Sequence, residues 1–165
     1  MLSEILPHLE TPEHQFPARV ARATGMRLDE IFSADLVTEE GLLCFSLTDA
    51  KTEAGKRLVP IRDSLRDAVM LYHEGLSNSA AYSKRFGRAK SKVVGSGKRE
   101  IAFHSLRVQF ITKALQAGYA EMQVAWLVGH EEGKGDAMTG QLYHKGYSLQ
   151  TLKEIVEAVP EFLAA

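Results

Sequence analysis

Cysteine is nearly absent from this sequence. A single cysteine, Cys44, among 165 residues excludes an intramolecular disulfide. It lies in the apolar run "LLCFSL", where a buried structural thiol is expected rather than a nucleophile. His104, His130 and His144 lack the spacing of zinc ligands, and the cysteine is far from them in the chain. We therefore expect no metal site.

Long apolar runs are also missing. The sequence has no stretch of about 18 apolar residues, the length that indicates a membrane span, and no signal-peptide pattern at its N-terminus. Hydrophobic residues make up 45% of the chain and charged residues 25%, which is ordinary for a soluble globular protein. We expect one domain, residues 1–165, in a cytoplasmic protein that does not bind membranes.

Acidic residues are missing from one segment. The formal net charge of −1 gives no overall hint of a nucleic-acid partner, yet no aspartate or glutamate lies between Glu74 and Glu100. Seven basic residues fall in the same interval: Lys84, Arg85, Arg88, Lys90, Lys92, Lys98 and Arg99. A local excess of positive charge is typical of a strip that faces DNA phosphates. A merely solvated helix and loop is the alternative interpretation.

The hydrophobic pattern is mainly helical. "QFPARVARATG" predicts a short helix, with Pro17 in its first turn and Gly25 as its stop. "MRLDEIFSADL" predicts a further helical turn or two. The other predicted helices cover residues 61–76, 78–95, 104–118, 120–129 and 148–159.

Two short apolar runs interrupt the helices. "GLLCFSL" and "KRLVPI" flank "TDAKTEAG", whose aspartate, threonine and glycine suit a turn, so together they predict a β-hairpin. The expected fold class is mainly α with a small antiparallel β-sheet (α+β).

Three short motifs carry charged or basic groups at helix ends. In "ATGMRLDEI", Arg27 and Glu30 are three residues apart, so the carboxylate can orient a guanidinium whose fork stays available to a phosphate. A surface ion pair is the alternative. In "HSLR", His104 and Arg107 share one face at the start of a helix, a setting that suits an anion. In "LVGHE", His130 follows a helix-ending glycine.

Taken in order, these motifs resemble the catalytic domain of the tyrosine recombinases, also called phage-type integrases. The order is "TGMRLDE", a lysine in the hairpin "DAKTEAGKRLVPI", "HSLR", "LVGHE" and then a tyrosine. The resemblance extends over about residues 18–157. It implies the catalytic-domain fold of that family and a site-specific DNA recombinase or integrase. Such an enzyme cleaves and rejoins DNA strands through a covalent 3′-phosphotyrosine intermediate, without a cofactor.

The resemblance also implies which groups bind the phosphate. Arg27 matches the first catalytic arginine and Glu30 the acid that supports it, while Arg107 matches the second arginine. Two arginines can stabilise the negative charge that spreads over the phosphoryl oxygens in the transition state, the task that metal ions perform in other enzymes.

The resemblance also implies that a lysine and a histidine transfer protons. Lys51, with Lys56 as the nearby competitor, matches the hairpin lysine that protonates the leaving 5′-oxygen. His104 matches the group that helps the tyrosine lose its proton, since a tyrosine has a reference pKa of about 10. His130 is expected to hydrogen-bond a phosphate oxygen.

Two tyrosines compete for the nucleophile. The family's tyrosine usually lies about nine residues after the second histidine, where this sequence has Thr139. Ser148 suits the N-cap of the last helix, so that Tyr147 and Leu152 would form a hydrophobic staple. Tyr143 has no comparable structural role, and we assign it as the nucleophile.

The remaining expectations concern partners. Only 26 residues precede Arg27, too few for the N-terminal core-binding domain that the family normally carries. A catalytic domain without it should bind double-stranded DNA weakly and be a monomer or weak oligomer when free, whereas the family forms tetramers on DNA. The apolar stripe of residues 148–165 would pack either on its own domain or in trans on a neighbouring protomer.

Two alternative functions fit the same motifs. A type IB topoisomerase-like enzyme shares the chemistry but reseals the strand it cut. A non-catalytic DNA-binding module would keep the fold and have lost activity, although every expected charged group is retained.

Overall fold

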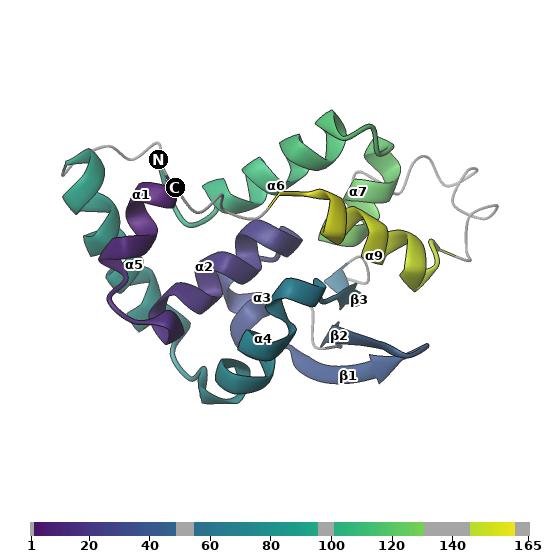
Figure 1. Ribbon diagram of the computed structural model, residues 1–165, viewed down its shortest axis with the longest axis horizontal. Helices are drawn as coiled ribbons and strands as arrows, with labels where there is room; N and C mark the ends of the chain where they lie inside the picture. The colour runs from purple at the N-terminus through teal and green to yellow at the C-terminus, as the bar shows by residue number, and fades with distance from the viewer. Residues whose placement is uncertain (1, 49–54, 96–100, 131–145, 161–165) are drawn as a thin grey trace.

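The protein is described here by a computed structural model that covers residues 2–48, 55–95, 101–130 and 146–160. Most of these residues are helical, and one three-stranded antiparallel sheet lies among the helices (Figure 1). The expected α+β class is therefore confirmed. No helix in the described ranges is long and apolar enough to cross a membrane.

Helix α2 (Pro12–Thr24) lies at the centre of the fold, in contact with helices on several sides. It begins earlier than the sequence predicted, because Thr11 caps it and Pro12 takes its first position. Pro17 consequently lies inside the helix and not in its first turn, where it forgoes one backbone hydrogen bond. The predicted stop at Gly25 is confirmed by a left-handed backbone with φ of 70°.

A short helix and a strand follow. Helix α3 (Leu28–Ser33) ends before the extended Ala34, and the chain then enters strand β1 (Asp35–Glu39). Residues 35 and 36, predicted as helical, are therefore strand. The reason lies in the next turn, where Glu40 and Gly41 both have positive φ and fold β1 back onto its neighbour.

The predicted hairpin is confirmed. Strand β2 (Leu42–Leu47) pairs antiparallel with β1 on one side and with β3 (Arg57–Pro60) on the other, giving the order β1-β2-β3. Cys44 is fully buried in β2, as expected of a structural thiol, and burial raises the pKa of that thiol.

The remaining helices agree closely with the hydrophobic pattern. Segment 61–76 is divided into 3₁₀ helix η3 (Asp63–Leu65), α4 (Arg66–Tyr72) and 3₁₀ helix η4 (His73–Gly75). It is followed by α5 (Ser79–Val94), α6 (Ser105–Gln116), α7 (Glu121–Val128) and α9 (Leu149–Ala158). Two elements before α2 had no prediction, α1 (Leu2–Ile5) and 3₁₀ helix η1 (Leu6–His8).

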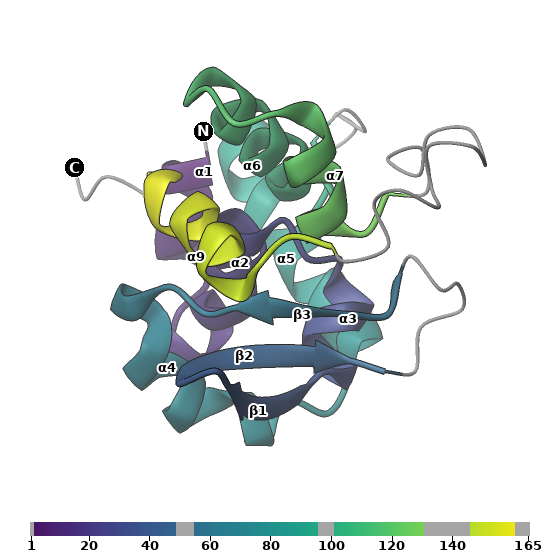
Figure 2. The ribbon, with the colours of Figure 1, turned by 90° about the vertical axis from the view of Figure 1, so that its right-hand side faces the viewer.

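Helix α9 packs against its own chain. It lies beside β3 and also contacts α2 and α7 (Figure 2). Its apolar stripe is buried, including Leu152, Ile155, Val156 and Val159. Ser148 caps its first turn by accepting a hydrogen bond from the Thr151 backbone, as predicted. Packing in trans on a neighbouring protomer stays a prediction.

A buried lysine anchors α9 to the end of the sheet. The Lys153 ammonium donates to the Ile61 carbonyl, lies 2.7 Å from Asp63 Oδ1 and lies 2.8 Å from Glu157 Oε1. Burial would lower the pKa of Lys153, but hydrogen bonds and charges from the two carboxylates outweigh burial and raise it. Its stabilising contribution is thus complete at neutral pH and is lost only as the pH rises through the elevated folded-state value.

We predict that Lys153→Met lowers the free energy of unfolding by about 1–3 kcal/mol, the usual effect of removing a hydrogen bond to a charged group. Urea denaturation followed by circular dichroism measures the change. Lys113→Met, at an exposed position of α6, is the matched control and should change stability by less than about 0.5 kcal/mol. Equal effects from the two substitutions would show that Lys153 does not anchor the helix.

Candidate active site

The site begins at the turn between α2 and α3. Thr24 is buried, and its hydroxyl donates to the Val20 carbonyl at 2.7 Å while accepting the Met26 N–H at 3.2 Å. These two bonds fix the path of the chain from α2 into Arg27. The "TGMR" motif is therefore a rigid turn that sets where the arginine leaves the backbone.

Gly25 is required in this turn for two reasons. Its φ of 70° is a conformation that L side chains rarely adopt, and a Cβ at this position would lie 2.7 Å from Phe110 and 2.8 Å from Val128. Helices α2, α6 and α7 thus meet closely here. The Gly25 carbonyl accepts a 2.7 Å hydrogen bond from Arg107 Nη1.

The Glu30 carboxylate binds two arginines. Its Oε2 accepts the Arg27 backbone N–H at 2.8 Å, and its Oε1 lies 3.1 Å from Arg27 Nη1. Arg57 adds a second pair, with Nη1 at 3.2 Å from Oε1 and Nη2 at 3.0 Å from Oε2. The carboxylate therefore accepts four hydrogen bonds, two of them from Arg27, while a catalytic role for this pair stays a prediction.

These contacts keep Glu30 ionised. Burial acts to raise its pKa, but the hydrogen bonds and positive charges of Arg57 and Arg27 outweigh burial, so the pKa lies below the usual glutamate value. The Glu30 side chain is 15% exposed and that of Arg27 is 48% exposed. Arg27 consequently keeps part of its guanidinium on the surface beside a charged, fixed carboxylate.

Sequence reasoning missed Arg57. Its side chain is 4% exposed and lies at the start of β3, in the segment "GKRLVPI". The sequence signal was a charged residue opening an otherwise apolar strand, but its partner Glu30 is 27 residues away and could not be predicted from the pattern.

Arg107 is the most buried charged residue of the cluster, with 1% of its surface exposed. Its Nε and Nη2 are buried and have no hydrogen-bond partner among the residues that the structure describes. Burial is the main cause that lowers the pKa of Arg107 to about 10, and nearby Arg27 also lowers it. At neutral pH the guanidinium stays charged with two unmet donors, a state that costs stability unless an anion binds.

The two predicted histidines lie at the ends of two helices that contribute to this cluster, α6 with Arg107 and α7 with the Leu127 carbonyl. His104 is the exposed residue immediately before α6, and its carbonyl accepts the Arg107 backbone N–H. Neighbouring Phe103 packs edge-on against Tyr82 and Phe86 of α5, which fixes the start of α6. His130 is exposed just after the left-handed Gly129 that ends α7.

Several predicted residues lie outside the described ranges: Lys51, Lys98, Arg99 and Tyr143. Lys56, the competitor of Lys51, is described and exposed. Tyr147 is described as well, and its ring is half-buried against Trp126 with centroids 6.4 Å apart. That ring is therefore anchored, and it packs against the core cluster that includes Leu152. The hydrophobic staple between Tyr147 and Leu152 stays a prediction.

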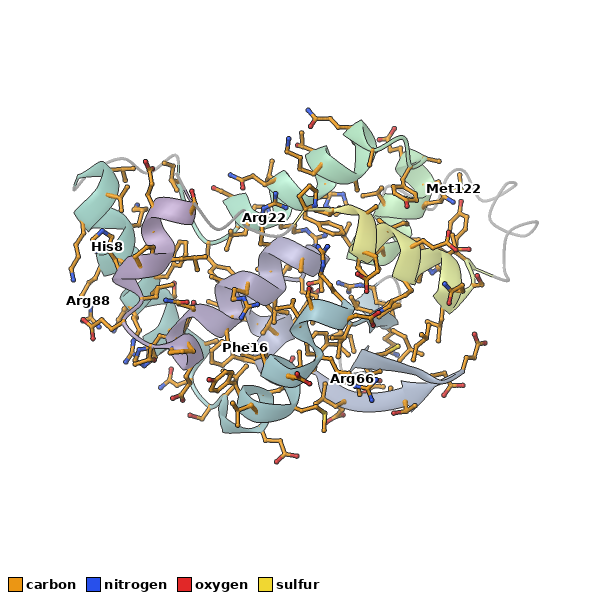
Figure 3. All side chains as sticks on the ribbon, in the orientation of Figure 1. His8, Phe16, Arg22, Arg66, Arg88 and Met122 are labelled. Carbon is orange, nitrogen blue, oxygen red and sulfur yellow. The ribbon has the colours of Figure 1, made fainter. Side chains whose placement is uncertain are left out.

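Helix α5 divides the predicted basic strip between two faces. Arg85, Arg88 and Lys92 line a hollow of about 340 Å³, whose opposite wall is formed by His8, Glu10 and His14. His8 and Arg88 lie together at one end of the molecule, far from Met122 at the other end (Figure 3). Helical geometry places Lys90 on the opposite flank of α5. The described basic residues of α5 therefore lie on two sides of that helix.

The cluster is suited to bind an anion with several oxygens. Arg27 and Arg57 hydrogen-bond to the Glu30 carboxylate, and Arg107 is near enough for the charges of these three groups to affect its pKa. Positive charge therefore exceeds negative charge there. Guanidinium forks match phosphate oxygens in geometry and charge. Among the described residues no group of three or more His, Cys, Asp or Glu could hold a metal ion.

Comparisons of this chain with protein-family models, with curated proteins and with solved structures find no match.

We predict that Gly25→Ala destabilises the protein by more than about 2 kcal/mol. The left-handed backbone costs an alanine about 1–2 kcal/mol, and the new methyl group would also overlap Phe110 and Val128. Gly118→Ala is the matched control, because Gly118 also has positive φ but no atom within 4 Å of the added Cβ. Chemical denaturation compares the two, and equal losses would contradict close packing at Gly25.

Proposed function

We propose that this chain is the catalytic domain of a site-specific DNA recombinase of the tyrosine recombinase type. The observation that carries the proposal is Arg107, a buried guanidinium beside the partly exposed Arg27, with two nitrogens that find no acceptor in the described part of the chain. A phosphodiester at this position would satisfy those donors. The motif order "TGMRLDE", "HSLR", "LVGHE" supplies the reaction type by resemblance.

The reaction would transfer a phosphoryl group between oxygens. A tyrosine oxygen attacks the DNA phosphorus, the bond to the 5′-oxygen breaks, and a 3′-phosphotyrosine remains on the protein. Attack by another 5′-hydroxyl reverses the step and releases the tyrosine. Arg27 and Arg107 would stabilise the charge on the non-bridging oxygens, a task for which their positions are fixed before substrate arrives.

Proton transfer completes the step. The leaving 5′-oxygen needs a proton, for which Lys51 is the first candidate and Lys56 the second. His104, one turn before Arg107, would help the tyrosine lose its proton. His130, beyond the end of α7, would hydrogen-bond a phosphate oxygen.

The placement of the other tyrosines supports Tyr143 as the nucleophile. Tyr82 is buried, its hydroxyl donates to the His14 carbonyl, and burial raises its pKa. Tyr119 donates to the Glu154 carbonyl, and Tyr72 packs against the Phe16 ring. Tyr147 packs on Trp126. Each of these four tyrosines has a structural role, which leaves Tyr143.

Two alternatives remain for the same site. A type IB topoisomerase-like enzyme would cleave by the same step and reseal the same strand. A non-catalytic DNA-binding module would use the arginine cluster for phosphate binding only. The unmet donors of Arg107 favour a phosphate ligand in all three cases, and the covalent adduct separates the two enzymes from the module.

In the proposed function, the basic residues of α5 would contact the phosphates of duplex DNA. Neutralising Lys84, Arg85 and Arg88 together should weaken binding to all DNA sequences and flatten the dependence of affinity on salt, because fewer counterions are released. Fluorescence anisotropy at several salt concentrations measures both quantities. Neutralising Lys90 in a separate variant would identify which face of α5 contacts DNA. An unchanged slope for the triple variant at low salt would remove this face from the interface.

The nucleophile can be tested with a suicide DNA substrate that traps the covalent intermediate. Tyr143→Phe should abolish the protein–DNA adduct on a denaturing gel while DNA affinity changes by less than about two-fold, because the hydroxyl is the reacting group. Tyr147→Phe is the matched control and should still form the adduct, since packing on Trp126 needs the ring and not the hydroxyl. Adduct formation by Tyr143→Phe with none by Tyr147→Phe would reverse the assignment.

A further inference from the structure

Arg57 makes contacts that none of the roles above explains. Its Nε donates to the Leu127 carbonyl at 2.8 Å, and its Nη1 donates to the Gly55 carbonyl at 2.9 Å. The same guanidinium donates to both oxygens of Glu30, at 3.2 Å and 3.0 Å. All three guanidinium nitrogens of Arg57 already donate to acceptors in the protein, so we assign Arg57 no direct contact with DNA.

These contacts join three elements that carry candidate catalytic groups. Glu30 lies in the first turn of α3 and fixes Arg27. Leu127 is in the last turn of α7, shortly before His130. Gly55 belongs to the hairpin arm that leads into β3 and is followed by Lys56. One planar group with its donors in fixed directions therefore sets the relative positions of all three.

Arg57 also determines how far the negative charge of Glu30 neutralises Arg27. With two arginines on one carboxylate, Glu30 neutralises neither completely. Without Arg57, the carboxylate would pair with Arg27 alone and cancel its charge at the place where a phosphate would bind. The cluster would then contain two guanidinium groups instead of three near the Glu30 carboxylate. Its electrostatic attraction for a phosphate would weaken.

We infer that Arg57 is a positioning residue: it holds Glu30, the end of α7 and the hairpin arm in one arrangement that leaves Arg27 and Arg107 available to the phosphate. This inference rests on the proposed recombinase chemistry for its effect on rate. Its effect on Glu30 is independent of that chemistry and can be measured without DNA.

The first measurement is the rate of adduct formation on the suicide substrate. Arg57→Lys keeps the charge but loses the fork, and Arg57→Gln loses both, so each should slow cleavage on the order of 10²-fold, the usual effect of small misplacements in an active site. DNA affinity should change by less than about two-fold. Arg66→Gln, which alters an exposed arginine at the start of α4, is the matched control and should leave the rate unchanged.

The second measurement is the pKa of the Glu30 carboxyl, by carbon NMR titration of the free protein. Arg57→Gln removes two of four hydrogen-bond donors and one adjacent positive charge, so this pKa should rise, whereas Arg66→Gln should not move it. General destabilisation would not move the pKa of a variant that is still folded, which separates positioning from a structural effect. Near-ultraviolet circular dichroism establishes that each variant is folded at the assay temperature.

The outcomes separate the two proposals. A wild-type rate in Arg57→Lys and Arg57→Gln, or a slow rate with an unchanged Glu30 pKa, would overturn the positioning role and leave the recombinase proposal standing. Failure of the wild-type protein to form any adduct would overturn the recombinase proposal. The NMR titration then decides about Arg57 by itself, because an unchanged Glu30 pKa in Arg57→Gln overturns the inference in that case as well.

Discussion

One carboxylate with four hydrogen-bond donors is the interaction on which the site depends. Glu30 binds Arg27 and Arg57 together, and Arg107 lies close enough for its pKa to be affected by all three. Bringing like charges together is costly, since the buried guanidinium groups of Arg57 and Arg107 lose hydration and all three guanidinium groups repel one another. A single anion does not neutralise three cations. The fold thus holds an excess of positive charge that an anionic ligand would relieve.

The surrounding packing keeps this unfavourable arrangement in place. The Gly25 carbonyl holds Arg107 from one side, and Phe110 and Val128 leave no room for a side chain at Gly25. The turn cannot relax without disturbing α2, α6 and α7 together. A protein interior resists such shifts because it is close-packed. The packed core therefore holds the Arg107 donors in fixed directions. Such preorganised donors favour charged transition states.

Local signals predicted the parts of this structure that depend on neighbouring residues. The caps at Gly25 and Ser148, the extent of α5 to α7 and the Arg27–Glu30 pair all involve groups within a few residues of each other. Strand β1 could not be predicted, because it is specified by its pairing with β2. Arg57 could not be predicted either, since its partners Glu30 and Leu127 are 27 and 70 residues away. Long-range hydrogen bonds leave no periodic trace in the sequence.

In the proposed function, exposed basic residues would provide affinity for DNA, whereas a buried arginine would bind the reacting phosphate. The basic residues on α5 are mostly exposed, so salt screens them strongly, and the overall charge of −1 adds no long-range attraction. Arg107 is buried, and salt screens it far less. Under the proposed function, raising the salt concentration should therefore weaken DNA binding through α5 well before it weakens phosphate binding by the arginine cluster. In the proposed function, the donors of Arg107 would form a phosphate site that does not depend on surface charge, because the core and not the surface fixes their positions.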